Sequence, residues 1–163
     1  MGNLYKPTSP QLITRLGDLW QAETQVAYRL DEWLVRHLRE FDGADAEAVG
    51  AVRSRYQRAR RGVLEHVRAH GRAVARIPTL ADDVDADAPD AAARGLQRLF
   101  TAVSRADRRL DLVTAQARQY RDFACIAALA DLHDAHLDTL ELLRLLFQHG
   151  QSARLDPLRN RVA

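Results

Sequence analysis

Several acidic and imidazole side chains of this 163-residue chain fall on the apolar faces of the helices that its sequence predicts. Burying such groups is costly unless an ion or a hydrogen-bonding partner compensates them. Two histidines three or four positions apart on a helix point the same way, as metal ligands do in helical bundles. The candidate ligands of a divalent metal such as iron, manganese or zinc are Glu23, Glu65, His66, His70, His133 and His136.

The same side chains also have a structural interpretation, which we favour. Glu23 would bond a neighbouring arginine or Tyr28. Glu65 would pair with Arg61 and Arg68 on the surface of its helix. The histidines would lie at the edge of the core, each with a hydrogen-bonding partner. We therefore expect the inward polar groups to be mainly structural, and metal binding is the alternative.

Arginine supplies nearly all of the positive charge, because Lys6 is the single lysine among the 24 Lys and Arg residues. The net charge is only +2, and a coding bias towards arginine explains the count without a phosphate ligand. Residues 53–76 nevertheless carry many arginines with Tyr56 among them, and phosphate groups favour such a surface. An arginine-faced nucleic-acid binder is therefore a second alternative. The mixing of arginine with aspartate in residues 105–111 argues against it.

The sequence offers little other chemistry. Cys125 is the only cysteine, so no disulfide can form within the chain, and its alanine-rich surroundings indicate inert packing. No phosphate-binding loop, dinucleotide fingerprint or Gly-x-Ser-x-Gly motif occurs in the sequence. We therefore name no catalytic residue, and the sequence favours a protein that is not an enzyme.

Long helices must position the candidate ligands. The first is expected over residues 10–42, with Thr8 or Ser9 as its cap and Pro10 in its first turn. The second is expected over residues 45–77, and a proline follows it. The short loop between them predicts an antiparallel hairpin.

Residues 90–149 contain no proline, so they form either one continuous helix or two helices that turn near residues 119–122. Two helices match the first two in length. We therefore expect an all-α fold, an antiparallel up-down bundle of four long helices. Its expected parts are an N-terminal arm (1–9), the bundle domain (10–150) and a flexible C-terminal tail (151–163).

The number and length of these helices, and the phrase Leu19-Trp20-Gln21-Ala22-Glu23 on the first, resemble the ferritin-like four-helix bundles. Those bundles carry one Glu on each of two helices and a Glu-x-x-His motif on each of the other two. The resemblance implies Glu23 and Glu65 as ligands from the first two helices. It also implies His133-x-x-His136 as the motif of the fourth helix.

The chain departs from the family pattern in three places. Arg68 stands where the second-helix motif has histidine, and His133 stands where the fourth-helix motif has glutamate. On the third helix, Asp107 or Asp111 must replace a glutamate. These departures favour a single divalent ion over a two-metal site. A connector of 11 residues spans at most about 36 Å, less than a bundle of about 48 Å, so up-down-up-down order is expected in place of the ferritin crossover.

The function we predict is that of a non-catalytic helical bundle that acts by self-assembly, as a homo-oligomer, or by docking a protein partner on a helical face. The alternatives are the ferritin-like divalent-metal binder and the nucleic-acid binder described above. No apolar run approaches the roughly 20 residues that span a bilayer, and no secretory signal is recognisable. We therefore expect a cytoplasmic protein with no membrane partner.

Overall fold

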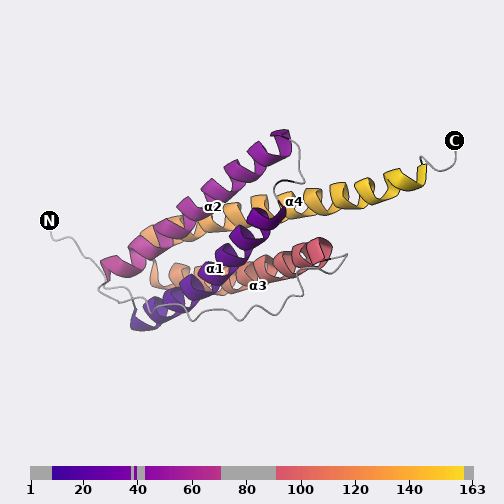
Figure 1. Cartoon of the computed structure of the whole chain (residues 1–163). Helices are drawn as coiled ribbons and strands as arrows, with labels where there is room; N and C mark the ends of the chain where they lie inside the picture. Colours follow the sequence, from indigo (N-terminus) through magenta and orange to yellow (C-terminus); the bar gives the residue numbers. More distant parts are fainter. Residues whose placement is uncertain (1–8, 38, 40–42, 71–90, 160–163) are drawn as a thin grey trace.

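A computed structural model describes residues 9–37, 39, 43–70 and 91–159 of the chain. The described residues form four helices: α1 (Pro10–His37), α2 (Gly43–Ala69), α3 (Ala91–Tyr120) and α4 (Phe123–Arg159). Figure 1 shows these helices packed side by side, and no strand occurs in the described part of the chain. The predicted all-α bundle of four long helices is confirmed.

Local signals explain where the helices start and stop. Pro10 is the first residue of α1, and the carbonyl of Ser9 accepts the first helical bond, from the Ile13 N–H at 3.0 Å. Proline suits this position because the N–H it lacks would have no partner there. The other expected cap, Thr8, lies outside the described residues.

The turn expected near residues 119–122 is confirmed, and the continuous long helix does not form. Arg121 adopts a left-handed conformation, with φ of 56°, directly after α3. The Asp122 N–H donates to the Ala117 carbonyl at 3.0 Å, and the Arg121 N–H donates to Arg118 at 3.1 Å. This pair of bonds is the Schellman arrangement that closes many helices. The Asp122 carboxylate then caps α4 by accepting the Cys125 N–H at 3.0 Å.

Contacts between helix ends give the direction of each helix. Asp31, late in α1, pairs with Arg53, early in α2, so these two helices are antiparallel. The Trp33 indole N–H, late in α1, donates to the carbonyl of Ala92 at the start of α3. His66, late in α2, contacts Asp122 beyond the end of α3. All neighbouring helices are therefore antiparallel, whereas α2 and α3 lie diagonally across the bundle and run in the same direction (Figure 1).

The order is thus up-down-down-up, and the expectation of up-down-up-down order was wrong. The reason is the length of the connection between α2 and α3. Because α2 ends at Ala69, twenty residues (71–90) separate His70 from α3. Such a segment can span about 70 Å, more than the length of a helix of about 40 Å. The structure of residues 71–90 lies outside the described part of the chain.

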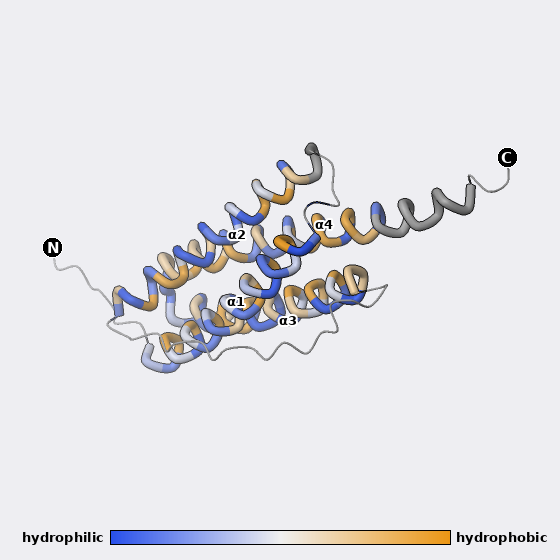
Figure 2. The backbone as a smooth tube through the Cα atoms, in the orientation of Figure 1, coloured by the Kyte–Doolittle hydropathy of each residue, from blue (hydrophilic) through white to orange (hydrophobic). Residues whose placement is uncertain are grey.

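The core lies where the apolar stripes of the four helices meet, and the tube in Figure 2 shows hydrophobic positions recurring along each helix. The apolar spacing of α3 predicts five inward residues, and all of them are buried: Leu96, Leu99, Val103, Leu110 and Val113. Most of the residues that the same spacing places inward on α1 and α4 are also buried. On α4, Leu140 is only partly buried, and Phe147 has 41 % of its surface exposed. None of the described helices combines the length and apolar character needed to cross a lipid bilayer.

Three helix ends differ from those expected. α1 stops at His37 rather than near residue 42, and α2 begins at Gly43. The expected extension of α2 to residue 77 lies outside the described residues. α4 continues past Gly150 to Arg159, so part of the expected C-terminal tail is helical. A single glycine costs a helix only about 1 kcal/mol and does not force it to end.

Candidate functional site

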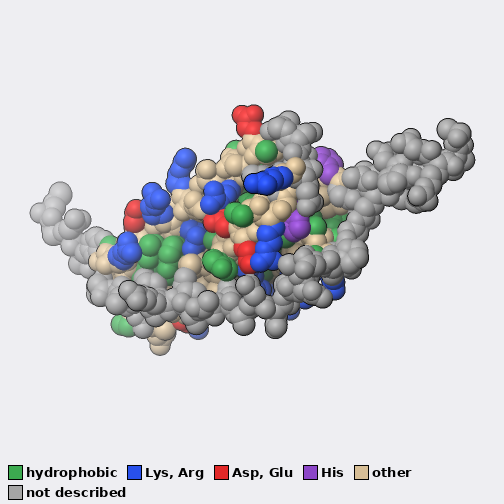
Figure 3. Space-filling view, viewed as in Figure 1, with side chains coloured by type: hydrophobic (Ala, Val, Ile, Leu, Met, Phe, Trp, Pro, Cys, Tyr) green, Lys and Arg blue, Asp and Glu red, His purple; other side chains and the backbone are tan. Residues whose placement is uncertain are grey.

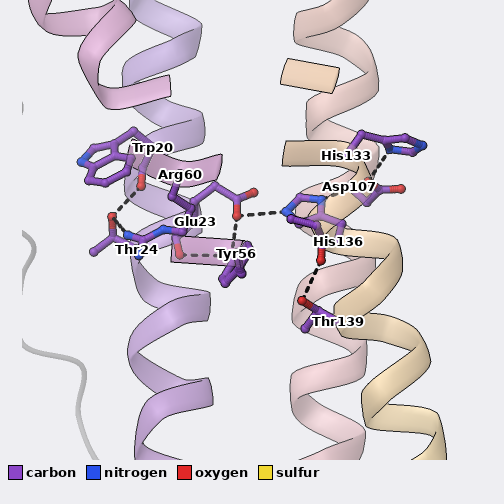
Figure 4. Close-up of polar contacts among 10 residues, drawn as sticks. Trp20, Glu23, Thr24, Tyr56, Arg60, Asp107, His133, His136 and Thr139 are labelled. Atoms are coloured by element: carbon purple, nitrogen blue, oxygen red, sulfur yellow. Dashed lines mark hydrogen bonds and ion pairs between the residues drawn. The ribbon is translucent and has the colours of Figure 1, made fainter. Parts of the chain in front are cut away.

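Polar side chains from all four helices meet in the middle of the bundle (Figure 4). We call this group the central cluster; it consists of Glu23 on α1, Tyr56 on α2, Asp107 on α3, and His133 and His136 on α4. The sequence places Glu23, Tyr56 and His136 on the apolar stripes of their helices, so packing of those stripes carries the polar groups inward.

The central cluster is a continuous chain of hydrogen bonds. Glu23 Oε2 accepts the Tyr56 hydroxyl at 2.5 Å and lies 3.0 Å from His136 Nε2. The other ring nitrogen of His136, Nδ1, lies 3.0 Å from Asp107 Oδ1. The same Asp107 oxygen lies 2.9 Å from His133 Nδ1. His136 therefore stands between two carboxylates, each bonded to one of its nitrogens.

Burial and charge set the protonation states of the side chains in the central cluster. Glu23 and His136 are both fully buried. Burial alone would lower the pKa of His136, but its bonds to Glu23 and Asp107 outweigh burial and raise that pKa. Burial, followed by the charge of Glu23, raises the pKa of Tyr56 well above its usual value. Tyr56 therefore stays protonated as a donor, and the imidazolium form of His136 is favoured.

Arg60 adds a second buried cation on the α2 side of the cluster. Its Nη2 donates to the Thr24 hydroxyl at 2.7 Å, and that hydroxyl donates to the Trp20 carbonyl at 2.8 Å. The guanidinium lies 4.7 Å from the centre of a Trp20 ring and 5.8 Å from that of Tyr56. Burial lowers the pKa of Arg60, but a guanidinium remains charged in proteins. Arg60, together with His136 in its imidazolium form, can therefore balance the charges of Glu23 and Asp107.

The central cluster does not provide a ferritin-like two-metal site. Such a site needs carboxylates that converge on the ions, but the nitrogens of His136 point to different carboxylates. On α2, Tyr56 and the cationic Arg60 occupy the face towards Glu23, where a carboxylate and a histidine are required. Glu23 Oε1 is buried without a hydrogen-bond partner among the described residues. At most, this oxygen and His136 Nε2 offer donors to one ion.

The structure does not bring all six sequence-predicted ligands together at one site. Glu23 and His136 meet in the central cluster, with His133 at its half-exposed outer end. Glu65 is exposed, about two and a half turns beyond Tyr56 on α2. His66 and His70 lie near the end of α2, where His66 contacts Asp122. Asp122 is not among the ligands expected from the sequence.

The register expected from the sequence was wrong for two helices. The expected helix bounds and up-down-up-down order predict that Glu23 is level with residues 64–65 on the second helix and with Glu141 on the fourth. It contacts Tyr56 and His136 instead. The expected partner Tyr28 is mostly exposed.

An arginine groove of about 460 Å³ lies between α1 and α3. Its cationic walls are Arg29 on α1 and Arg94, Arg98 and Arg105 on α3, with Gln97, Thr101 and Ala102 completing the lining. The α3 arginines recur at steps of four and seven, which places them on one stripe. Arg29, Arg98 and Arg105 form no ion pair with another described residue. The groove therefore concentrates positive charge, and that of Arg29, Arg98 and Arg105 is not neutralised by an ion pair with a described residue.

Some arginines outside the groove are neutralised by acidic residues. On α2, Arg53 pairs with Asp31 at 2.6 Å and Arg55 pairs with Asp138. On the described part of the face in Figure 3, cationic and acidic side chains are interspersed with apolar ones. Arg53 and Arg55 of the second helix therefore add no unpaired charge to a cationic surface of the kind that nucleic-acid binding favours.

Comparison with known proteins gives no relative: no protein-family model, no curated protein and no solved structure matches this chain.

Proposed function

We propose that this protein is a non-catalytic helical bundle that docks an acidic segment of a protein partner in the arginine groove. The observation that carries the proposal is the gathering of Arg29, Arg94, Arg98 and Arg105 around one groove. Arginine presents several donors in a rigid fork, which suits carboxylates.

The dimensions of the groove suit a short peptide. The α3 stripe from Arg94 to Arg105 rises about 16 Å along the helix axis. An extended segment of about five residues has this length. Alternate acidic residues of such a segment would reach successive arginines of the stripe.

The central cluster supports a scaffold role. Glu23 and His136 have no exposed surface, so a dissolved substrate has no access to their reactive atoms without opening of the bundle. The groups that resemble catalytic acids and bases are used to hold four helices together. The activity that remains is binding of a partner on a helical face, in the open arginine groove.

The test is titration of a fluorescent oligoglutamate peptide with the full chain at low and moderate salt. Wild type should bind, and binding should weaken with salt because the contacts are ionic. Arg98→Ala and Arg105→Ala should each weaken binding about tenfold. Arg36→Ala is the matched control, because Arg36 lies outside the groove and is paired with Glu32 at 2.6 Å. It should bind as wild type does.

Three outcomes would contradict the proposal. The first is equal loss of binding in the control and the groove variants. The second is tighter binding of single-stranded DNA than of oligoglutamate, with the same dependence on Arg98 and Arg105. The third is that the peptide binds only to a variant in which Asp83, Asp85 and Asp87 are changed to Asn. That result would mean that these acidic residues of the chain itself occupy the groove.

A ferritin-like, single-ion protein is the second candidate. Two observations favour it: the up-down-down-up order of the helices and the buried Glu23 oxygen without a partner. Glu23 and His136 would be the ligands, and Asp107 would orient the imidazole as carboxylates do in many metal sites. Addition of manganese or ferrous iron should then raise the melting temperature of wild type but not that of Glu23→Gln. No shift with either ion would contradict this candidate.

Self-assembly into a homo-oligomer stays a prediction from the sequence. The mass of the protein in solution, measured by light scattering over a range of concentrations, tests it.

A further inference from the structure

A second polar group, separate from the central cluster, lies near the end of the bundle where α2 meets the turn between α3 and α4. His66 of α2, Asp122 of the turn and Cys125 of α4 each offer one metal-binding atom, and these atoms all lie within 4.8 Å of one another. Among the described residues, this is the one such group of three or more His, Cys, Asp or Glu side chains. We propose that His66, Asp122 and Cys125 bind a single zinc-class divalent ion.

The fold holds the carboxylate of this site in place. Asp122 Oδ1 accepts the Cys125 N–H at 3.0 Å as the cap of α4. Its other oxygen, Oδ2, lies 3.2 Å from His66 Nε2. One oxygen thus anchors the side chain while the other faces the imidazole, the arrangement by which outer hydrogen bonds orient metal ligands.

His70 supports the imidazole from the next turn of α2. Its Nδ1 lies 2.9 Å from the His66 carbonyl oxygen, and the two rings are 4.8 Å apart. This tilted ring contact, with 48° between the ring planes, restricts the rotation of His66 about its side-chain bonds. The site therefore has three protein ligands, which leaves the fourth position of a tetrahedral ion to water.

The donor set selects the class of ion. A thiolate, an imidazole and a carboxylate together suit zinc, whereas calcium and magnesium take oxygen ligands. Tetrahedral zinc holds such donors at about 2.0–2.3 Å. The three donors are already close, so the ion has to draw them together by little more than an ångström.

Access and burial differ among the three ligands. The His66 and Asp122 side chains retain 12 % and 13 % of their exposure, whereas Cys125 is buried. An ion can therefore approach from the side of His66 and Asp122. Cys125 then closes the site from the core side.

The thiol must lose its proton for the ion to bind. Burial, followed by the charge of Asp122, raises the pKa of Cys125 to about 12. At neutral pH the thiol is protonated, so the ion forms a bond to Sγ as the proton leaves for the solvent. The sulfur lone pair makes the new bond and nothing is oxidised or reduced. Binding should therefore release a proton to the solvent.

Cobalt is the probe, because the thiolate-to-cobalt absorption band reports sulfur coordination. Cys125 is the only cysteine, so such a band in the chain can arise only from Cys125. Wild type should develop it on addition of one equivalent of Co²⁺, together with visible bands of tetrahedral cobalt. Zinc should then displace cobalt and abolish the bands.

Three site variants and one control decide the assignment. Cys125→Ser should lose the charge-transfer band, and His66→Gln and Asp122→Asn should bind cobalt at least about tenfold more weakly. Asp122→Asn retains an oxygen that can cap α4, which separates loss of binding from loss of folding. Glu23→Gln is the control in the central cluster and should bind cobalt at this site as wild type does. Helix content is checked by circular dichroism.

The proposal is overturned if wild type shows no charge-transfer band. It is also overturned if His66→Gln and Asp122→Asn both bind cobalt with wild-type affinity. A band that disappears in Glu23→Gln alone would likewise contradict it. None of these results bears on the arginine groove, because the oligoglutamate titration contains no metal.

Discussion

His136 and Glu23 are 113 positions apart in the sequence, yet Nε2 of the first lies 3.0 Å from Oε2 of the second in the centre of the bundle. Because Asp107 bonds the other nitrogen of His136, this imidazole joins α1, α3 and α4. The free-energy cost of removing these charges from water offsets much of the stabilisation from their attraction. We infer that the main effect of the contact is to specify the level at which the helices meet.

Replacement of His136 should destabilise the fold strongly. His136→Leu removes the group between the two carboxylates and, among the described residues, leaves Glu23 with only the Tyr56 hydroxyl and Asp107 with only His133 as partners, which should cost about 3–5 kcal/mol in the free energy of unfolding. The double variant Glu23→Leu, His136→Leu should lose less than the sum of its single changes, because it removes both partners. Urea unfolding of the three variants measures these differences.

His133→Leu is the control for that comparison. Its side chain is 40 % exposed, and Asp107 keeps its bond to His136 without it. We therefore expect a change of less than about 1 kcal/mol. A cost for His136→Leu no larger than that of His133→Leu would contradict the central role of His136.

The contribution of His136 should depend on pH. Because the folded protein raises the pKa of His136, protonation of this imidazole favours folding. The stabilisation is complete below the ordinary histidine pKa of about 6.5 and is lost as pH rises through the higher pKa of the folded state.

Thermal unfolding of wild type and His136→Gln from about pH 6 upward tests this dependence. The difference in stability between the two proteins should be largest at the acid end and shrink as pH rises. A difference that grows with pH would show that the neutral imidazole is the form the fold favours.

Much of the fold could be predicted because local signals agree with it. The proline start of α1 and the apolar stripes of α3 needed no knowledge of the tertiary structure. The turn after Tyr120 carries no glycine or proline, and matching helix lengths located it. The left-handed residue there is Arg121, whose sequence gives no sign of that conformation.

The geometry of the central cluster could not be predicted because it depends on helix ends. In an antiparallel pair of helices, an error in the predicted position of the loop changes the residue that faces a given position by twice that error. Since α1 stops at His37, about five residues before the expected end, the residue opposite Glu23 moves about two turns along α2, to Tyr56. The partners of Glu23 changed accordingly, although Glu23 itself was correctly placed in the core.

Arg121→Gly should stabilise the protein. A left-handed conformation costs an ordinary residue roughly 1–2 kcal/mol, and glycine avoids this cost but loses more entropy on folding. The net gain should be about 0.5 kcal/mol. Asp122→Ala should have the opposite effect, since it removes the α4 cap and the contact with His66, at a cost of about 0.5–2 kcal/mol. Melting temperatures of the two variants should lie on opposite sides of the wild-type value. A melting temperature of Arg121→Gly below that of wild type would contradict the inference that Arg121 is strained.

Two glycines inside helices should respond oppositely to alanine. Gly62 on α2 has nothing within 4 Å of where a Cβ would stand, so Gly62→Ala should gain about 0.5–1 kcal/mol from helix propensity. At Gly95 on α3, the added carbon would stand 2.6 Å from Trp33 Cδ1 and 2.9 Å from Nε1. The buried indole cannot retreat freely, because its N–H donates to the Ala92 carbonyl at 3.1 Å. Gly95→Ala should therefore lose about 1–3 kcal/mol.

Thermal and urea unfolding of both alanine variants measure these changes. A second substitution, at Trp33, tests whether the indole causes the cost of Gly95→Ala. Trp33→Phe removes Nε1 and its bond to Ala92 and presents a smaller ring towards α3. If the clash with Trp33 is responsible, the cost of Gly95→Ala should be smaller in the Trp33→Phe protein than in wild type, while the gain from Gly62→Ala should be the same in both. An equal cost of Gly95→Ala in the two backgrounds would mean that α1 and α3 are not packed as closely at this point as the indole contact requires.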